Sequence, residues 1–371
     1  MALMNHSQYK ETLVQARYVT NEVLQKNWYT KLSNISLSVI GQSEEGEEIA
    51  SITLGRGSKK VLMWSQMHGN ESTTTKAALD LVNFLSSKNE LAKIINDNCT
   101  ITLVPILNPD GAKRYTRANA NNIDLNRDAK LLSQLESQAL RKLFEAFGPD
   151  YCFNLHDQRT LFSAGNAKKP ATISFLSPAS DPERKMNPTR ESAMKLIVAM
   201  NQELQKEIPG QVGRYDDGFN DNCVGDFFQM KKVPTILFEA GHYPNDYERE
   251  KTREYIFHSL IEALKVIAEN RIHEFRVADY FKIPENEKRF YDILVKNPQE
   301  INPDLTPNVS VGIRFKEVLE TNRVLFEPEI VDVAELNGYF GHETFDCSLK
   351  NDVEQLHSRK EILNLIVNSK N

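Results

Sequence analysis

Apolar runs alternate with amphipathic helical patterns along most of this sequence, and that alternation constrains the fold more than any other feature. Runs rich in β-branched and apolar residues predict strands at 35–40, 48–54, 61–67, 100–107, 151–155 and 235–238. Apolar residues at helical spacing predict helices at 8–26, 78–85, 131–147, 191–207 and 247–270. Because strands and helices alternate, we expect a three-layer α/β/α domain with a mixed, largely parallel central sheet.

Composition limits the classes of function. The chain has 371 residues, 40% of them apolar, which suffices for a catalytic domain with a buried core. Its net charge is −6 with both signs interspersed, so nucleic acid is not an expected partner. No signal-peptide pattern and no apolar run long enough to cross a bilayer is present, so no membrane partner and a cytoplasmic location are predicted. The four cysteines are widely spaced, which predicts buried thiols rather than a disulfide framework.

The last quarter of the chain has a different character. Short apolar runs at 310–315 and 323–326 lie between prolines, and a helical pattern covers 353–367. We therefore predict a catalytic domain at 1–275 and a small C-terminal appended region at 276–371, with no chemistry assigned to the latter.

Four residues that can take part in metal chemistry follow three predicted strands. His68 and Glu71 come after the run 61–67, His156 follows 151–155, and Glu239 follows 235–238. Open α/β sheets bind ligands beyond the carboxyl ends of their strands, so these side chains are expected at one crevice. Histidine and carboxylate are ligands that zinc accepts, and the His-x-x-Glu spacing supplies half of a zinc site.

Several short motifs occur in a distinctive order. They are His68-Gly69-Asn70-Glu71, Asn108-Pro109-Asp110-Gly111, Arg117, Asn126-Arg127 within Ile123–Asp128, His156 within Asn154–Asp157, and Glu239 within Phe238–Gly241. In this order the chain resembles the zinc metallocarboxypeptidases, the carboxypeptidase A-like group, over residues of about 35 to 270. The order is far more specific than the His-x-x-Glu pair alone.

The resemblance implies a role for each residue of the reaction centre. His68, Glu71 and His156 would bind one zinc ion and leave one coordination position open. Glu239 would be the general base, and Arg117 would stabilise the negative charge that develops on the substrate oxygen.

The resemblance also implies how substrate is held. Asn126 and Arg127 would bind the free carboxylate of a peptide or small amide substrate, because a guanidinium offers paired donors. Tyr215 is the nearest match to a tyrosine that closes over this carboxylate in secreted digestive members, although Phe219 lies between it and Glu239. Relatives build the side-chain pocket in the stretch 216–226, whose aspartates suggest a preference for basic side chains.

Two other functions fit the same residues. The related aspartoacylase and succinylglutamate desuccinylase group also has a His-Gly-Asn-Glu opening, so hydrolysis of an N-acyl amino acid is the first alternative. The motif at 108–111 favours the peptidase. An inactive metal-binding or peptide-binding module is the second alternative, and retention of all three ligands together with Glu239 argues against it. The sequence does not predict the oligomeric state.

Overall fold

The structure is a computed structural model that describes residues 4–32 and 35–370. It divides into two compact units. Unit 1 runs to Gln158 and resumes at Ala171–Asn286, whereas unit 2 comprises Arg159–Pro170 and Glu287 onward. The sequence placed the division at 275/276, so unit 1 extends further and unit 2 also takes a short earlier segment. Among the described residues, no helix is both long and apolar enough to span a membrane.

Unit 1 is built on an eight-stranded sheet. In spatial order its strands are β1 (Ser36–Gln42), β2 (Glu48–Gly55), β4 (Cys99–Val104), β3 (Lys59–Ser65), β5 (Tyr151–Asp157), β9 (Thr235–Ala240), β7 (Ile173–Leu176) and β8 (Val212–Arg214). The four central strands β4, β3, β5 and β9 are parallel. Strands β1 and β2 add on antiparallel at one side, and β7 is antiparallel to β9 at the other. The mixed sheet with a parallel centre is confirmed.

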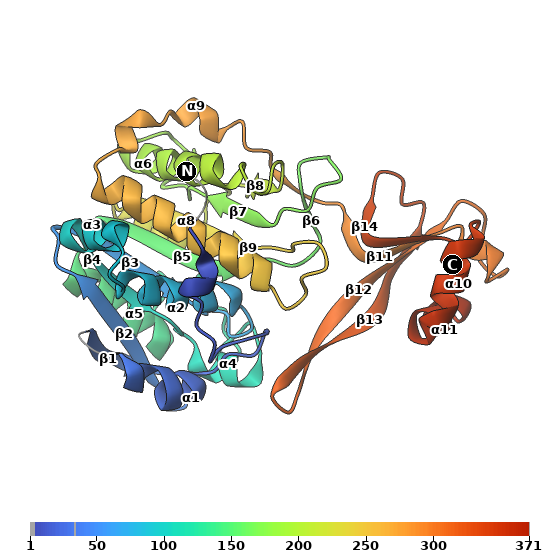
Figure 1. Cartoon of the computed structure of the whole chain (residues 1–371), viewed down its shortest axis with the longest axis horizontal. Helices are drawn as coiled ribbons and strands as arrows, with labels where there is room; N and C mark the ends of the chain where they lie inside the picture. Colours follow the sequence, from blue (N-terminus) through green and yellow to red (C-terminus); the bar gives the residue numbers. More distant parts are fainter. Residues whose placement is uncertain (1–3, 33–34, 371) are drawn as a thin grey trace. The chain divides into compact units, whose positions relative to one another are not determined.

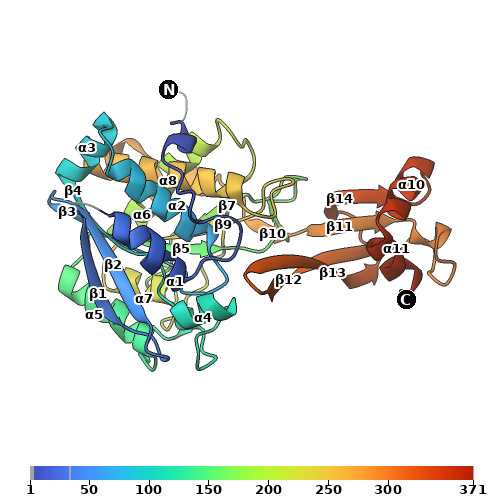
Figure 2. The ribbon, with the colours of Figure 1, turned by 60° about the horizontal axis from the view of Figure 1, so that its bottom comes forward.

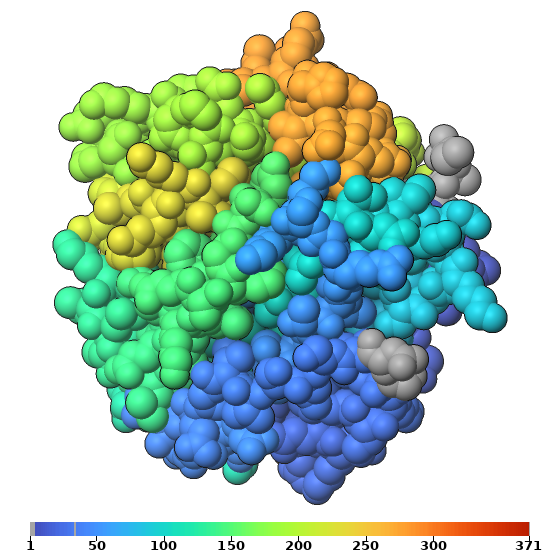
Figure 3. Space-filling model, turned by 90° about the vertical axis from the view of Figure 1, so that its left-hand side faces the viewer, coloured from blue at the N-terminus to red at the C-terminus, as the bar shows by residue number. Residues whose placement is uncertain are grey.

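Helices cover both faces of this sheet (Figure 1). One side carries α2 (Thr73–Leu85), α3 (Glu90–Asn98), α6 (Pro188–Leu204), α8 (Glu250–Ala268) and α9 (Val277–Tyr280), and the other carries α5 (Leu135–Phe147) and α7 (Val224–Met230). Shorter elements are η1 (His6–Gln8), α1 (Asn21–Val23), η2 (Leu24–Trp28), η3 (Tyr29–Lys31), α4 (Pro109–Arg114), η4 (Leu125–Arg127) and η5 (Ile272–Glu274). In Figure 3, segments far apart in sequence lie side by side on one face.

Successive side chains of a strand point to opposite faces of the sheet, and this alternation explains the two hydrophobic cores of unit 1. In β3, Val61 and Met63 join the core beneath α2, α6 and α8, while Leu62 and Trp64 join the core beneath α5 and α7. All four side chains are fully buried. A strand with both faces covered reads as a continuous apolar run, which is the pattern of 61–67. The three-layer α/β/α fold is therefore confirmed.

The predicted helix at 8–26 is wrong for residues 9–20, and only its end coincides with helical structure, in α1 and η2. Most of this N-terminal segment is irregular, with only η1, α1 and η2 as short turns. Three of its backbone carbonyls accept from other elements of unit 1: Arg253 donates to the carbonyls of Glu11 and Val14, and Ser72 donates to that of Arg17. These tertiary hydrogen bonds replace the helical ones that the apolar spacing predicted.

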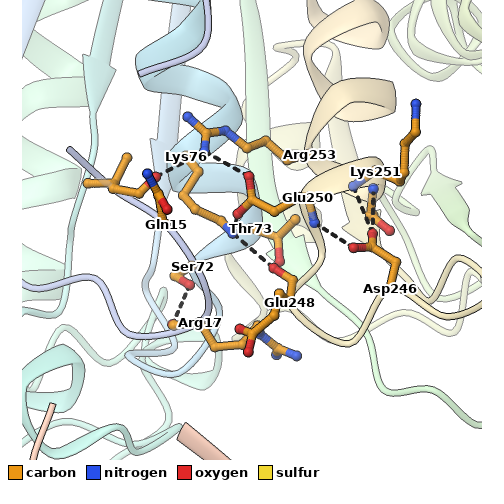
Figure 4. Close-up of polar contacts among 12 residues, drawn as sticks. Gln15, Arg17, Ser72, Thr73, Lys76, Asp246, Glu248, Glu250, Lys251 and Arg253 are labelled. Atoms are coloured by element: carbon orange, nitrogen blue, oxygen red, sulfur yellow. Dashed lines mark hydrogen bonds and ion pairs between the residues drawn. The ribbon is translucent and has the colours of Figure 1, made fainter. Parts of the chain in front are cut away.

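Beneath the N-terminal segment lies a group of charged side chains, which we name the α2–α8 charge cluster: Lys76, Asp80, Glu250 and Arg253 (Figure 4, which labels all but Asp80). Arg253 Nη2 lies 2.6 Å from Asp80 Oδ1, and Lys76 Nζ lies 2.6 Å from Glu250 Oε1. Lys76, Asp80 and Arg253 are fully buried. The cluster joins α2 to α8.

Unit 2 has its own small core. A four-stranded sheet in the order β13-β12-β11-β14 is accompanied by two helices (Figure 2). Its elements are β6 (Phe162–Ala164), β10 (Asn286–Lys288, which starts on the last residue of unit 1), β11 (Phe290–Lys296), η6 (Pro298–Glu300), β12 (Ser310–Glu320), β13 (Arg323–Ala334), β14 (Phe340–Asp346), α10 (Lys350–Ser358) and α11 (Lys360–Val367). The predicted helix at 353–367 is thus two helices that meet at Arg359.

Candidate metal centre

Three side chains converge at the carboxyl ends of β3 and β5. His68 lies in the loop after β3, Glu71 lies just before α2, and His156 belongs to β5. The loop packs tightly on α4, because a Cβ added at Gly69 would lie 1.9 Å from the carbonyl carbon of Gly111. Glycine at 69 therefore permits the approach that sets the position of His68.

The donor atoms of the three side chains face one another. Glu71 Oε1 lies 2.9 Å from His68 Nδ1, and Glu71 Oε2 lies 2.9 Å from His156 Nδ1. The two Nδ1 atoms are 3.1 Å apart. One potential ligand atom from each residue lies within 4.8 Å of the others, and all three residues are buried. No other group of three such residues is found in the described part of the chain.

This donor set fits zinc. Two imidazole nitrogens and a carboxylate are the ligands of hydrolytic zinc sites that keep an open position. The Nδ1 atoms of His68 and His156 face each other at 3.1 Å. If both atoms are unprotonated, their lone pairs face each other, and a cation could accept both lone pairs. His68, Glu71 and His156 could therefore hold the ion.

A second layer of charged groups surrounds the three ligand candidates. His68 Nε2 lies 2.9 Å from Asp124 Oδ1, which fixes the ring so that Nδ1 faces Glu71. Arg117 spans two carboxylates, with Nη1 3.2 Å from Glu71 Oε1 and Nη2 3.1 Å from Asp124 Oδ2. The backbone N–H of Asp157 donates to Glu71 Oε2 at 3.1 Å. Each oxygen of Glu71 is thus oriented by its neighbours.

The pKa values reflect this mixture of burial and charge. Burial opposes the charged form of His68, but Glu71 and Asp124 outweigh it and raise the pKa of His68. Burial lowers the pKa of His156. Burial also acts against the Glu71 carboxylate, yet the two histidines hold the pKa of Glu71 far below its usual range. The carboxylate is therefore ionised at neutral pH.

Glu239 lies on the strand beside His156. Strands β5 and β9 run parallel, and His156 is paired in register with Glu239. Burial, followed by the charges of Glu71 and Asp157, raises the pKa of Glu239 well above its usual value. A carboxyl group that keeps its proton more readily than usual, next to a candidate metal centre, suits acid–base chemistry.

The predicted carboxylate-binding pair lies on η4, two and three residues after Asp124. The Asn126 side-chain oxygen accepts the backbone N–H of Val224 at the start of α7, at 3.3 Å. Arg127 Nη1 donates to the Asn126 carbonyl at 2.8 Å, and the Arg127 side chain is exposed. Asn126 is therefore held by α7, while Arg127 remains accessible.

Tyr215 follows β8 and lies near the centre. Its hydroxyl is 2.8 Å from Gln158 Oε1, and its backbone N–H donates to the carbonyl of Phe175 at 3.0 Å. Burial raises the pKa of Tyr215, and the negative charges of Glu239 and Glu71 raise it further. The structure thus brings Tyr215 into the electrostatic range of the predicted base.

Comparison with known families identifies the chain. A sequence model of the zinc carboxypeptidases matches residues 21–208, just over half of the chain. The chain belongs to the zinc carboxypeptidase family. The match covers His68, Glu71 and His156 and ends before Tyr215 and Glu239.

Curated relatives match part of the chain. Carboxypeptidase 2 of Trichophyton rubrum is 30% identical over 139 residues, which cover 35% of this chain and 25% of that protein. Carboxypeptidase SOL1 of Arabidopsis thaliana is 33% identical over 124 residues, which cover 30% of this chain and 25% of that protein. The matched region thus spans about a quarter of the length of these relatives.

Solved structures share the fold. A metallo-carboxypeptidase from Burkholderia cenocepacia aligns with a TM-score of 0.53 at 20% identity, over 65% of this chain and 66% of that chain. A metallo-carboxypeptidase from Pseudomonas aeruginosa, in complex with (2-guanidinoethylmercapto)succinic acid, aligns with a TM-score of 0.52 at 17% identity, over 66% and 68%. At these identities the likeness concerns the fold.

Neighbouring cations of the protein pair with most of the aspartates in the acidic segment 216–226. Arg184 lies within ion-pair distance of Asp216 and Asp217, and Lys130 pairs with Asp221. Asp226 differs, because burial raises its pKa to about 7. Three of the four aspartates thus already have a cation from the protein.

Sequence reasoning did not single out Asp124 or Asp157. Asp124 was visible inside the motif Ile123–Asp128, two residues before the predicted carboxylate-binding pair. Asp157 immediately follows His156, and its carboxylate accepts the backbone N–H groups of Thr73 and Thr74 at the start of α2. Asp157 thus ties β5 to the helix that follows Glu71.

Proposed function

We propose that this member of the zinc carboxypeptidase family is a zinc-dependent hydrolase that cleaves a C-terminal peptide or amide bond. The observation that carries the proposal is the convergence of His68, Glu71 and His156 with Glu239 in register on the next strand. One ion held by three protein ligands leaves an open position for substrate.

The proposed chemistry divides between the ion and the side chains. When bound, zinc supplies a Lewis acid that polarises a carbonyl and acidifies water. Glu239 takes a proton from the attacking water and later returns it to the leaving amine, a role for which its place beside His156 on the next strand is suited. Arg117 faces the same space from its contacts with Glu71 and Asp124, and there it offsets negative charge on the substrate oxygen.

The proposed substrate carries a free carboxylate. Arg127 is exposed near η4 and can offer two parallel N–H donors, and Asn126 beside it is fixed by α7. We expect Arg127→Ala to cost roughly 2 to 5 kcal/mol of transition-state stabilisation for the acid, and much less for the same substrate with an amidated terminus. Arg114→Ala is the matched control, because Arg114 is an exposed arginine paired with Glu45.

The charges around segment 216–226 affect which substrate side chain the enzyme would prefer. Since Asp216, Asp217 and Asp221 already have cationic partners, only Asp226 remains as a buried carboxyl group for a basic substrate side chain. Otherwise identical peptides ending in Lys, Leu and Glu would test this point. A clear preference for Glu would exclude an acidic pocket and leave the carboxylate-binding role of Arg127 intact.

The deciding experiment is a mass-spectrometric screen of peptides and N-acyl amino acids, with and without added zinc. We expect the zinc-loaded protein to release C-terminal residues from peptides. Glu239→Gln should retain zinc and lose roughly 10²-fold or more in turnover, the usual scale for a general base. Turnover close to that of the wild type in Glu239→Gln would exclude this mechanism, and release of acyl groups without peptide cleavage would exclude the peptidase. The guanidino dicarboxylic acid bound in the Pseudomonas structure is a suitable competitor in the same assay.

A further inference from the structure

Three polar side chains form a connected group on the side of Glu239 away from His156. They are Gln158, Ser174 and Asn286, and Tyr215 is attached to them through its hydroxyl. Ser174 on β7 is paired in register with Glu239 on β9, which in turn is paired with His156 on β5. Side chains paired across neighbouring strands project from the same face of the sheet, so the group lies directly beside the predicted base.

The orientation of the Gln158 amide follows from one contact. Gln158 Nε2 lies 2.6 Å from the carbonyl oxygen of Ala171, which can only accept. The amide nitrogen is therefore fixed on that side, and Oε1 faces the opposite way. At 2.8 Å from Oε1, the Tyr215 hydroxyl must be the donor. Gln158 is 5% exposed, so water does not readily replace this bond.

Asn286 completes the group. Its Nδ2 donates to Gln158 Oε1 at 3.1 Å and to Ser174 Oγ at 3.0 Å, and its Oδ1 accepts from Ser174 Oγ at 3.1 Å. The neighbouring strand leaves room for this amide, because a Cβ added at Gly213 would lie 1.9 Å from Asn286 Oδ1. Glycine at 213 is therefore part of the arrangement.

Gln158 and Asn286 also lie at the boundaries between the two units along the chain. Gln158 is the last residue of unit 1 before 159–170, and Asn286 is the last before 287–371. The side chains at both points where the chain leaves unit 1 thus meet at Gln158 Oε1, the atom that also accepts the Tyr215 hydroxyl.

We propose that Gln158 and Asn286 are positioning residues that hold the Tyr215 hydroxyl beside Glu239 for contact with the substrate. The proposal rests on the proposed function for its effect on turnover, but the positioning itself does not depend on that function. Gln158→Met keeps the length of the side chain and removes the amide oxygen that accepts the Tyr215 hydroxyl. Gly213→Ala displaces Asn286 from the other side.

Two measurements test the proposal. The first is the ¹⁹F NMR signal of 3-fluorotyrosine placed at position 215 of the full chain. We expect one sharp resonance in the parent protein and a shifted or broadened one in Gln158→Met and Gly213→Ala. Gln229→Met is the matched control, because Gln229 is a buried glutamine of unit 1 whose Oε1 accepts the backbone N–H of Thr235 instead. An unchanged resonance in both test variants would overturn the proposal even if no substrate were found.

The second measurement is a double-mutant cycle on a cleaved peptide. Gln158→Met should raise KM by ~3- to 10-fold, the scale of one lost hydrogen bond, with kcat changed less. In a Tyr215→Phe background the same substitution should have almost no further effect, because the hydroxyl it holds is already absent. Effects that add fully in the double variant would show that Gln158 does not act through Tyr215. Failure of every peptide and acyl substrate would count against the proposed function, while the fluorine signal would still decide the positioning.

Discussion

The metal centre and the α2–α8 charge cluster both bury ionisable side chains, yet they balance them differently. In the cluster each carboxylate meets cations of the protein: Arg253 donates to both oxygens of Asp80, and Lys76 pairs with Glu250. Burial lowers the pKa of Lys76 to about 8, and Lys76 in turn helps hold the pKa of Glu250 at about 2 against the effect of burial.

At the metal centre, cations of the protein balance the carboxylates less completely. Glu71 faces two imidazoles whose nearest nitrogens also face each other, and Glu239 adds a further carboxyl group. The protein cation in contact with Glu71 is Arg117, whose side chain is half exposed. The comparison teaches that buried charge by itself does not mark a functional site. A site is marked where several lone pairs point at one place and the protein supplies too little positive charge to meet them.

The largest expected effect breaks the charge cluster. Asp80→Asn would remove the carboxylate that accepts two of the buried Arg253 donors and leave Glu250 as its remaining anionic partner. The expected loss is roughly 3 to 5 kcal/mol in the free energy of unfolding. Urea unfolding followed by circular dichroism would measure it, and added zinc should not restore the loss. A loss below about 1 kcal/mol would show that the Asp80–Arg253 pair contributes little to the stability of the cluster.

The next effect comes from the metal centre. Because zinc is expected to bind the native state, free zinc at 100 times the Kd should stabilise the protein by about 2.7 kcal/mol. Thermal unfolding of chelator-treated protein with and without zinc would show this as a rise in Tm. His156→Ala should show almost no such rise, and an equal rise in both proteins would place the zinc elsewhere.

Asp226 offers an intermediate case, a buried carboxyl group that the protein balances only weakly. Burial raises its pKa to about 7, against opposing effects from the N–H groups of Asn220 and Ala179, the Cys223 thiol and the Arg127 charge. A carboxyl group with a raised folded-state pKa stabilises the fold fully below its unfolded pKa of about 4, and this contribution is lost as pH rises towards 7.

Asp226→Asn should therefore remove part of the pH dependence of stability. We expect the variant to gain stability relative to wild type between pH 4 and pH 8, by about 1.4 kcal/mol for each unit by which folding raises the pKa of Asp226. Denaturant unfolding at both pH values would measure the difference. Parallel stability curves for the two proteins would contradict the raised pKa.

The smallest effect is expected at an exposed ion pair, which serves as a surface control for the buried groups. Asp97 pairs with Arg56, whose side chain is 81% exposed. Asp97→Asn should change the free energy of unfolding by less than about 1 kcal/mol, because solvent screens such a pair. A change as large as that of Asp80→Asn would remove the distinction between buried and exposed pairs.

The same comparison explains what could be predicted from sequence. The ligand candidates sit at the ends of apolar strand runs, and strands β3, β5 and β9 place their carboxyl ends at one edge of the sheet. A local pattern plus one rule about sheets was therefore enough to bring His68, His156 and Glu239 together. Their roles in catalysis remain predictions.

The charge cluster and the N-terminal segment could not be predicted in this way. Asp80 and Arg253 are 173 positions apart, and nothing near either residue in sequence indicates the other. The apolar spacing of residues 8–26 resembled a helix, but the carbonyls of this segment bond to Ser72 and Arg253 from other elements. Such bonds depend on the assembled fold, as does the contact of Gln158 with Tyr215.

The most direct test is the zinc content and affinity of the purified protein, measured by equilibrium dialysis and mass spectrometry of the metal. We predict one zinc ion per chain in the wild type. Asp124→Asn should bind it 10- to 100-fold more weakly, the scale for loss of a partner that orients a ligand. His68→Ala and His156→Ala should lose more still. Full zinc occupancy in both histidine variants after dialysis would contradict the assignment of His68, Glu71 and His156 as the metal centre.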